Sequence, residues 1–120
     1  MARILVVDDD ELTRQVIHQM VETLGHQATS AASGSEALNA CREHSFDLVV
    51  TDLLMPDQDG IELIRELHRL RPELRILAVS GGGQVTATNY LTSARMLGAV
   101  GVLAKPFSRT DLREALERAL

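Results

Sequence analysis

Carboxylate, hydroxyl and amino side chains follow four short apolar runs of the sequence. These groups are Asp8-Asp9-Asp10, Asp52, Ser80 and Lys105. Carboxylates that lie close together cannot all ionise at low cost unless a cation is present. An all-oxygen cluster suits Mg²⁺, which keeps several waters and takes one or two carboxylates together with a phosphate. With a lysine and a hydroxyl to contact an anion, and a carboxylate as nucleophile, the set predicts phosphoryl transfer to an aspartate.

The apolar runs have the composition of strands. They span residues 3–7, 27–32, 47–51, 75–80 and 100–104. All except 27–32 are rich in Val, Ile and Leu and do not alternate polar with apolar residues. This pattern is typical of strands that are covered on both faces of a parallel sheet. The run 27–32 is the weakest strand of the five.

Segments with helical spacing of apolar residues separate the runs. They cover residues 10–24, 35–43, 61–70, 84–97 and 108–120. The first carries an apolar stripe made of Leu12, Val16, Ile17, Met20, Val21 and Leu24. Gly25 and Pro72 are expected to stop the first and third helices. The last helix carries Leu112, Leu116 and Leu120.

The repeated order of strand and helix predicts an α/β fold. We expect a doubly wound, five-stranded parallel sheet with right-handed crossovers and helices on both faces. Sites in such sheets form outside the carboxyl ends of the strands. The reactive groups that follow the runs should therefore meet at one edge of the sheet.

Bulk properties bound the function. The chain has 120 residues, enough for one domain with one core, and a formal net charge of −5. The acidic balance argues against nucleic acid as a direct partner. The single Cys41 excludes an intrachain disulfide and fits a reducing compartment. No apolar stretch approaches the length of a membrane span and the N-terminus does not resemble a signal peptide, so we expect a cytoplasmic protein.

Each feature also has a simpler explanation when it is taken alone. Acidic residues before a helix commonly cap it, and Asp10 keeps this role because it directly precedes the first helical stripe. Ser80, followed by three glycines, could be a flexible turn, and Lys105 a solvated surface lysine. The functional interpretation rests on the groups meeting at one edge.

The stretch "VVTDLLMPDQDG" at residues 49–60 holds three aspartates with different expected roles. Asp52 ends a strand and is the expected nucleophile. Asp57 follows a proline in a turn. Asp59 precedes the third helix and, with Glu62 three residues on, matches a capping box. A calcium loop fits poorly, because Met55 would occupy its first ligand position.

Four motifs in order resemble the receiver domain of two-component response regulators. They are "ILVVDDD", "DLVVTDLLMPDQDGIELI", "ILAVSG" and "AKPF", and the resemblance covers essentially the whole chain. It implies a flavodoxin-like fold with the strand order 2-1-3-4-5. It also implies one receiver domain over residues 1–120, with no output domain within them.

The resemblance implies a metal site in this chain. Asp52 matches the phosphoacceptor, which is also a metal ligand. Asp9 matches the direct ligand of Mg²⁺ (or Mn²⁺), and Asp8 its mostly water-mediated companion. The backbone carbonyl of Leu54 matches the remaining ligand from the protein.

The resemblance also implies how the phosphoryl group is contacted. Ser80 matches the hydroxyl that hydrogen-bonds the group, and Lys105 matches the lysine that pairs with one of its oxygens. The Lys105–Pro106 peptide bond is expected to be cis. Such a domain catalyses only its own phosphoryl transfer and slow autodephosphorylation, so we do not expect an enzyme that acts on a separate substrate.

The implied partners are proteins. The donor would be a sensor histidine kinase or a phosphotransfer protein, and a downstream protein would bind the face made by the fourth helix, fifth strand and fifth helix. The domain would be a monomer or a phosphorylation-dependent dimer. One departure affects this switch: the family usually has Tyr or Phe where this chain has Val102. Tyr90 in the fourth helix is a speculative substitute.

Three other functions fit less well. A phosphatase of the haloacid dehalogenase type needs a second aspartate at position 54, which is leucine here. A receiver-like interaction module that is never phosphorylated usually lacks part of the acidic set. A flavin-binding domain would want hydroxyl groups after the first strand, where this chain has three aspartates that would repel phosphate.

Overall fold

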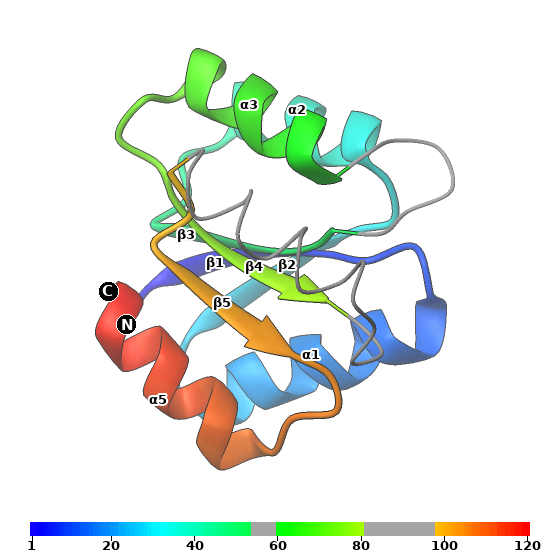
Figure 1. Cartoon of the computed structure of the whole chain (residues 1–120), viewed down its shortest axis with the longest axis vertical. Coiled ribbons are helices and arrows are strands. Elements are labelled where there is room, and N and C mark those ends of the chain that lie inside the picture. Colours follow the sequence, from blue (N-terminus) through cyan, green and yellow to red (C-terminus); the bar gives the residue numbers. More distant parts are fainter. Residues whose placement is uncertain (54–59, 81–97) are drawn as a thin grey trace.

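The computed structural model describes residues 1–53, 60–80 and 98–120, and within these a single parallel sheet. Its strands are β1 (Arg3–Val7), β2 (Gln27–Ala31), β3 (Leu48–Asp52), β4 (Arg75–Ser80) and β5 (Gly101–Ala104). They pair in the order β2-β1-β3-β4-β5 (Figure 1). The predicted strand order is therefore confirmed, with β3 running one residue later than expected.

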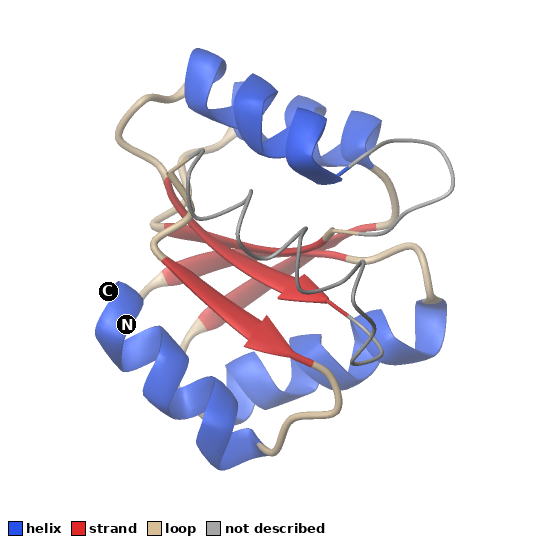
Figure 2. Cartoon of the chain, viewed as in Figure 1, coloured by secondary structure: helices blue, strands red, loops and turns tan. Residues whose placement is uncertain are grey.

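Helices cover both faces of this sheet (Figure 2). The described helices are α1 (Glu11–Thr23), α2 (Gly34–Glu43), α3 (Gly60–Leu70) and α5 (Arg109–Ala119). Helices α1 and α5 lie on one face, and α2 and α3 lie on the other. The helix predicted over 84–97 lies outside the described residues, and so does Tyr90.

Two cores form because neighbouring residues of a strand point to opposite faces. In β1, Leu5 and Val7 belong to the core under α2 and α3, while Ile4 and Val6 belong to the core under α1 and α5. The residues of β3 and β4 divide in the same way. This arrangement explains why these strands are continuously apolar, as the sequence predicted.

The prediction that the run 100–104 is covered on both faces is wrong in part. Strand β5 starts at Gly101, is half-buried over its first three residues and exposed at Ala104. In the described part of the chain it is the edge strand beside β4. Strand β2 is the other edge and is mostly exposed, which agrees with its weak sequence pattern.

The apolar stripe of α1 is only partly buried. Ile17 and Val21 face the core, whereas Leu12 is 70% exposed and Val16 is 43% exposed. Residues four apart lie on one line along a helix, so these two pairs form neighbouring lines, and only one of them faces the sheet. In α5, Leu112 and Leu116 are buried, whereas Leu120, the residue that follows the helix, is exposed.

The helix ends follow local chemistry. Asp10 caps α1 as predicted, and its carboxylate accepts a hydrogen bond from the backbone N–H of Thr13. Gly25 has a φ of 95° just after α1, a conformation that favours glycine and ends the helix there. Ser108 and Asp111 form a capping box at the start of α5, which the sequence analysis missed. The capping role predicted for Asp59 lies outside the described residues.

Two further expectations concern the backbone and the membrane. The Lys105–Pro106 peptide bond is cis, as the resemblance implied. Among the described helices, none combines the length and the apolar character that a membrane crossing requires.

Replacement of Leu67 tests how much the core under α3 contributes to the stability of the domain. It is fully buried, so Leu67→Ala should lower the free energy of unfolding by about 2–5 kcal/mol, through lost burial and the cavity left behind. Leu12→Ala is the matched control, because the exposed Leu12 side chain should change stability by less than about 0.5 kcal/mol. Urea denaturation measures both values, and equal losses would contradict this assignment of the core.

Candidate functional site

The carboxyl ends of four strands bring the predicted reactive groups to one edge of the sheet (Figure 1). Asp8 follows β1, and Asp52 ends the neighbouring strand β3. Ser80 ends β4 and pairs in register with Ala104 of β5, which directly precedes Lys105. The backbone N–H of Lys105 donates to the carbonyl oxygen of Ser80 at 2.7 Å. The expected convergence is therefore present.

Asp8, Asp9 and Asp52 form an acidic cluster at this edge. One carboxylate oxygen from each lies within 4.8 Å of the others. Asp8 and Asp52 are buried, while Asp9 is exposed to solvent. Both oxygens of Asp8 are engaged: Oδ1 accepts from the N–H of Asp10 at 2.9 Å, and Oδ2 accepts from Lys105 Nζ at 2.9 Å.

Lys105 partly neutralises the cluster. Its Nζ lies 2.9 Å from Asp8 Oδ2 and 3.5 Å from Asp52 Oδ2, and its side chain is 22% exposed. Burial by itself would lower the pKa of Lys105. The hydrogen bond to Asp8 and the charges of Asp52 and Asp8 outweigh burial, so the pKa of Lys105 is raised. The group is therefore a charged ammonium held between two carboxylates.

The amino-acid composition also distinguishes Lys105 from the other basic residues of the chain. It is the only lysine in the chain, and the other eleven of the twelve Lys and Arg residues are arginines. An ammonium is a compact point charge, whereas a guanidinium is a broad planar fork. The single lysine stands where a small cation must fit between two carboxylates.

Ser80 adds a buried hydroxyl at the same edge of the sheet. It is 1% exposed, and its Oγ has no hydrogen-bond partner among the described residues. A buried polar group without a partner costs about 1–3 kcal/mol. Such a group in a native site calls for an explanation, and an anion bound at this edge would supply one.

The cluster fits a hard cation. Its donors are carboxylate oxygens, which Mg²⁺ and Mn²⁺ prefer, and the three aspartates are close enough to share one ion. Lys105 offsets one of their negative charges, so the cluster keeps a negative balance. The backbone carbonyl of Leu54, the remaining predicted ligand, lies outside the described residues.

Arg14 is a neighbour of the site that the sequence analysis missed. Its Nη1 donates to the backbone carbonyl of Asp8 at 2.8 Å. Its position in the sequence could have drawn attention to it. A cation in the first turn of a helix opposes the helix dipole, which favours acidic residues there.

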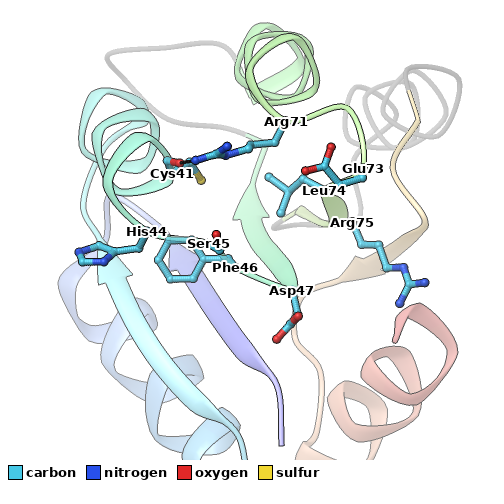
Figure 3. Close-up of a pocket in the computed structure, with 9 residues that line it drawn as sticks. All are labelled: Cys41, His44, Ser45, Phe46, Asp47, Arg71, Glu73, Leu74 and Arg75. Carbon is cyan, nitrogen blue, oxygen red and sulfur yellow. Dashed lines mark hydrogen bonds between the residues drawn. The ribbon is translucent and has the colours of Figure 1, made fainter.

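A separate pocket of about 240 Å³ lies at the opposite ends of the strands (Figure 3). Its lining includes Cys41, Asp47, Arg71 and Arg75, and none of the predicted site residues. Arg71 reaches across it to the carbonyl oxygen of Cys41, at 3.0 Å from Nη2. Burial raises the pKa of the Cys41 thiol, although the charge of Arg71 acts in the other direction. The Cys41 thiol is therefore not activated as a thiolate.

Comparison with known proteins agrees with the fold. The pattern of the response regulator receiver domain matches residues 4–117. The chain is 33% identical over 120 residues to the response regulator receiver protein CpdR of Brucella abortus and covers 98% of it. It is 33% identical over 119 residues to the chemotaxis protein CheY of Bacillus subtilis and covers 97% of that protein.

Similarity to receiver domains extends to longer relatives and to solved structures. The chain is 37% identical over 119 residues to the DNA-binding transcriptional regulator NtrC of Azospirillum brasilense, but spans only 24% of its length. The receiver domain of NtrX from Brucella abortus superposes with a TM-score of 0.91 at 32% identity, covering 98% of this chain and 97% of that one. The chain belongs to the family of response regulator receiver domains.

Proposed function

We propose that this receiver domain, a phosphorylation-dependent switch of two-component signalling, accepts its phosphoryl group on Asp52. One observation carries the assignment. The ammonium of Lys105 contacts both Asp8 and Asp52, beside a buried Ser80 hydroxyl that has no partner among the described residues. Nucleophile, cation and hydrogen-bond donor are thus held together on rigid strand ends.

The transfer needs one bond to form and one to break. A carboxylate oxygen of Asp52 attacks the phosphorus of the donor, and a new P–O bond forms. The bond from phosphorus to the donor breaks, and the leaving group takes its electron pair. Lys105 meets a phosphoryl oxygen that gains negative charge, and the Ser80 hydroxyl donates to another. Positioning and charge stabilisation are the main requirements of this chemistry.

A cation completes the site. Asp9 and Asp52 would bind Mg²⁺ directly, and the family resemblance adds the carbonyl of Leu54. The family resemblance gives Asp8 a mostly water-mediated role, and the hydrogen bonds that both of its oxygens already accept are compatible with it. When bound, Mg²⁺ supplies positive charge against the phosphoryl oxygens. Asp9 is the exposed member of the cluster, so it is the ligand most accessible to an incoming ion.

Phosphorylation would change the charge that Lys105 experiences. A phosphoryl group adds a charge of about −1.5 to −2 at neutral pH, with new acceptor oxygens. Lys105 would then leave its contact with Asp8 in favour of the phosphoryl group, and the Ser80 hydroxyl would gain a partner. Val102, which packs against the core under α2 and α3, has no ring that could rotate in response. Transmission would therefore start from the backbone link between Lys105 and Ser80.

The partners follow from this chemistry. A sensor histidine kinase or a phosphotransfer protein would supply the phosphoryl group, and a downstream protein would read the face that includes β5 and α5. The domain would catalyse its own phosphorylation and slow dephosphorylation, without turning over a separate substrate.

Asp52 can be tested directly. Incubation with acetyl phosphate and Mg²⁺ should add about 80 Da, one phosphoryl group, to the intact mass. Asp52→Asn should abolish the gain, because an amide is not a comparable nucleophile. Asp47→Asn is the matched control, since Asp47 directly precedes the same strand at its opposite end. A full gain in Asp52→Asn would refute the assignment.

Lys105 should speed phosphorylation and weaken Mg²⁺ binding, and a single variant measures both effects. Lys105→Met should slow phosphorylation by about a hundredfold, because a donor to the developing charge is lost. The same variant should bind Mg²⁺ more tightly, because the ammonium that competes for Asp8 and Asp52 is gone. Intact mass over time and titration calorimetry measure the two effects. Arg109→Met removes an exposed cation outside the site and should change neither. Weaker Mg²⁺ binding in Lys105→Met would contradict its placement.

A further inference from the structure

Arg14 makes a contact that the proposed chemistry does not use. It lies in the first turn of α1, is half-buried, and its Nη1 donates to the backbone carbonyl of Asp8 at 2.8 Å. This carbonyl follows the last residue of β1. The hydrogen bond therefore joins the start of α1 to the point where β1 delivers its carboxylates.

The position of Arg14 is unfavourable for the helix itself. The first turn of a helix favours acidic residues and disfavours cations. The neighbouring Asp10 and Glu11 follow this preference, and Arg14 does not. Hydrogen bonds from Thr13 are the main reason that the pKa of Asp10 is lowered, and the charge of Arg14 is the last of several causes. Helix stability thus gives a weak reason for an arginine at this position.

The hydrogen bond from Arg14 also restrains Asp9, through the peptide group that joins Asp8 to Asp9. The carbonyl of Asp8 and the N–H of Asp9 belong to the same planar unit, so a bond that holds the carbonyl also fixes the start of Asp9. Asp8 has further restraints, because Asp10 and Lys105 hold its carboxylate. Within the described segments, the exposed side chain of Asp9 takes part in no hydrogen bond that could orient it. The backbone therefore sets where the Asp9 side chain starts and which rotamers can reach the cluster.

We propose that Arg14 is a positioning residue for the cation of this site. By holding the Asp8–Asp9 peptide group, it presents the Asp9 carboxylate to the ion, and it acts without touching the ion or the phosphoryl group. The inference rests on the proposed function, because it assumes that Asp9 is a ligand. Part of the affinity of the domain for Mg²⁺ would therefore depend on Arg14.

Two effects of Arg14 on the cation have opposite signs. Its positive charge repels the ion, so loss of charge alone would tighten binding. Its hydrogen bond orients a ligand, so loss of the bond would weaken binding. The Debye length falls from about 10 Å at 0.1 M salt to about 3 Å at 1 M, so raised salt weakens the repulsion. Partners that orient metal ligands are worth about 10–100-fold in affinity. We expect the hydrogen bond to be the larger effect, and the sign of the change at raised salt identifies it.

The test is titration calorimetry of the full chain with MgCl₂. Arg14→Met, which keeps the aliphatic stem and removes the donors, should weaken Mg²⁺ binding about tenfold. Arg14→Lys, which keeps a charged donor on a different geometry, should recover part of that loss. Arg71→Met is the matched control: it removes an arginine bond to the carbonyl of Cys41, far from the cluster, and should leave Mg²⁺ affinity unchanged.

A kinetic measurement separates positioning from general damage. Phosphorylation of Arg14→Met by acetyl phosphate should be slow at low Mg²⁺ and return to the wild-type rate when Mg²⁺ saturates the variant. A damaged fold would not be restored in this way. Circular dichroism checks the fold, and if Arg14→Met does not fold, Arg14→Lys carries the same comparison with a smaller loss.

The outcomes distinguish the inference from the function on which it rests. Weaker Mg²⁺ binding that persists at raised salt, with recovery of the rate at high Mg²⁺, supports the positioning role. Unchanged or tighter binding in Arg14→Met, with a wild-type domain that binds Mg²⁺ and gains mass, overturns this role alone. A wild-type domain that binds no Mg²⁺ and gains no mass overturns the proposed function, and the role of Arg14 with it.

Discussion

One ammonium held between two buried carboxylates is the interaction on which the rest of this domain depends. Buried charges are costly unless they are paired and hydrogen-bonded. Lys105 pairs with Asp8 and Asp52 across two strand ends that are distant in the sequence. The single positive charge cannot balance both partners and Asp9 as well, so the edge keeps a negative balance. A cation, and then an anionic phosphoryl group, can each be accommodated by rearranging the same few contacts.

This charge cluster is possible because the scaffold around it is apolar and well packed. Strands β1, β3 and β4 alternate their side chains between two cores, one under α2 and α3 and one under α1 and α5. Coverage on both faces fixes the strand ends, and parallel pairing places Asp8 beside Asp52 and Ser80 beside Ala104. The carboxylates and Ser80 therefore stand at the ends of well-packed strands, and Lys105 follows the edge strand beside them.

The site also departs from what stability alone would select. Ser80 keeps a buried hydroxyl that lacks a partner in the described structure, and Arg14 places a cation where the helix dipole disfavours one. Both features lie at the edge of the sheet that carries the acidic cluster. Val102, by contrast, is partly buried and packs against the core under α2 and α3, so under the proposed function a change of charge at Asp52 would reach the surface by other contacts.

The sequence by itself determined the elements and the chemical set. Apolar runs and helical spacing predicted β1, β3, β4 and the helices α1, α2, α3 and α5. Burial of an element on one or two faces requires apolar residues at regular positions, and this pattern can be recognised in the sequence. The positions of Asp8, Asp52, Ser80 and Lys105 after those runs predicted the edge at which they meet.

Only the tertiary structure decided which groups are paired. The contacts of Lys105 with Asp8 and Asp52, the engagement of both Asp8 oxygens and the bond from Arg14 join residues far apart or on different elements. No local pattern encodes them. The same holds for the exposure of Leu12 and Val16 and for the half-buried edge strand β5, because burial depends on which neighbours the fold supplies.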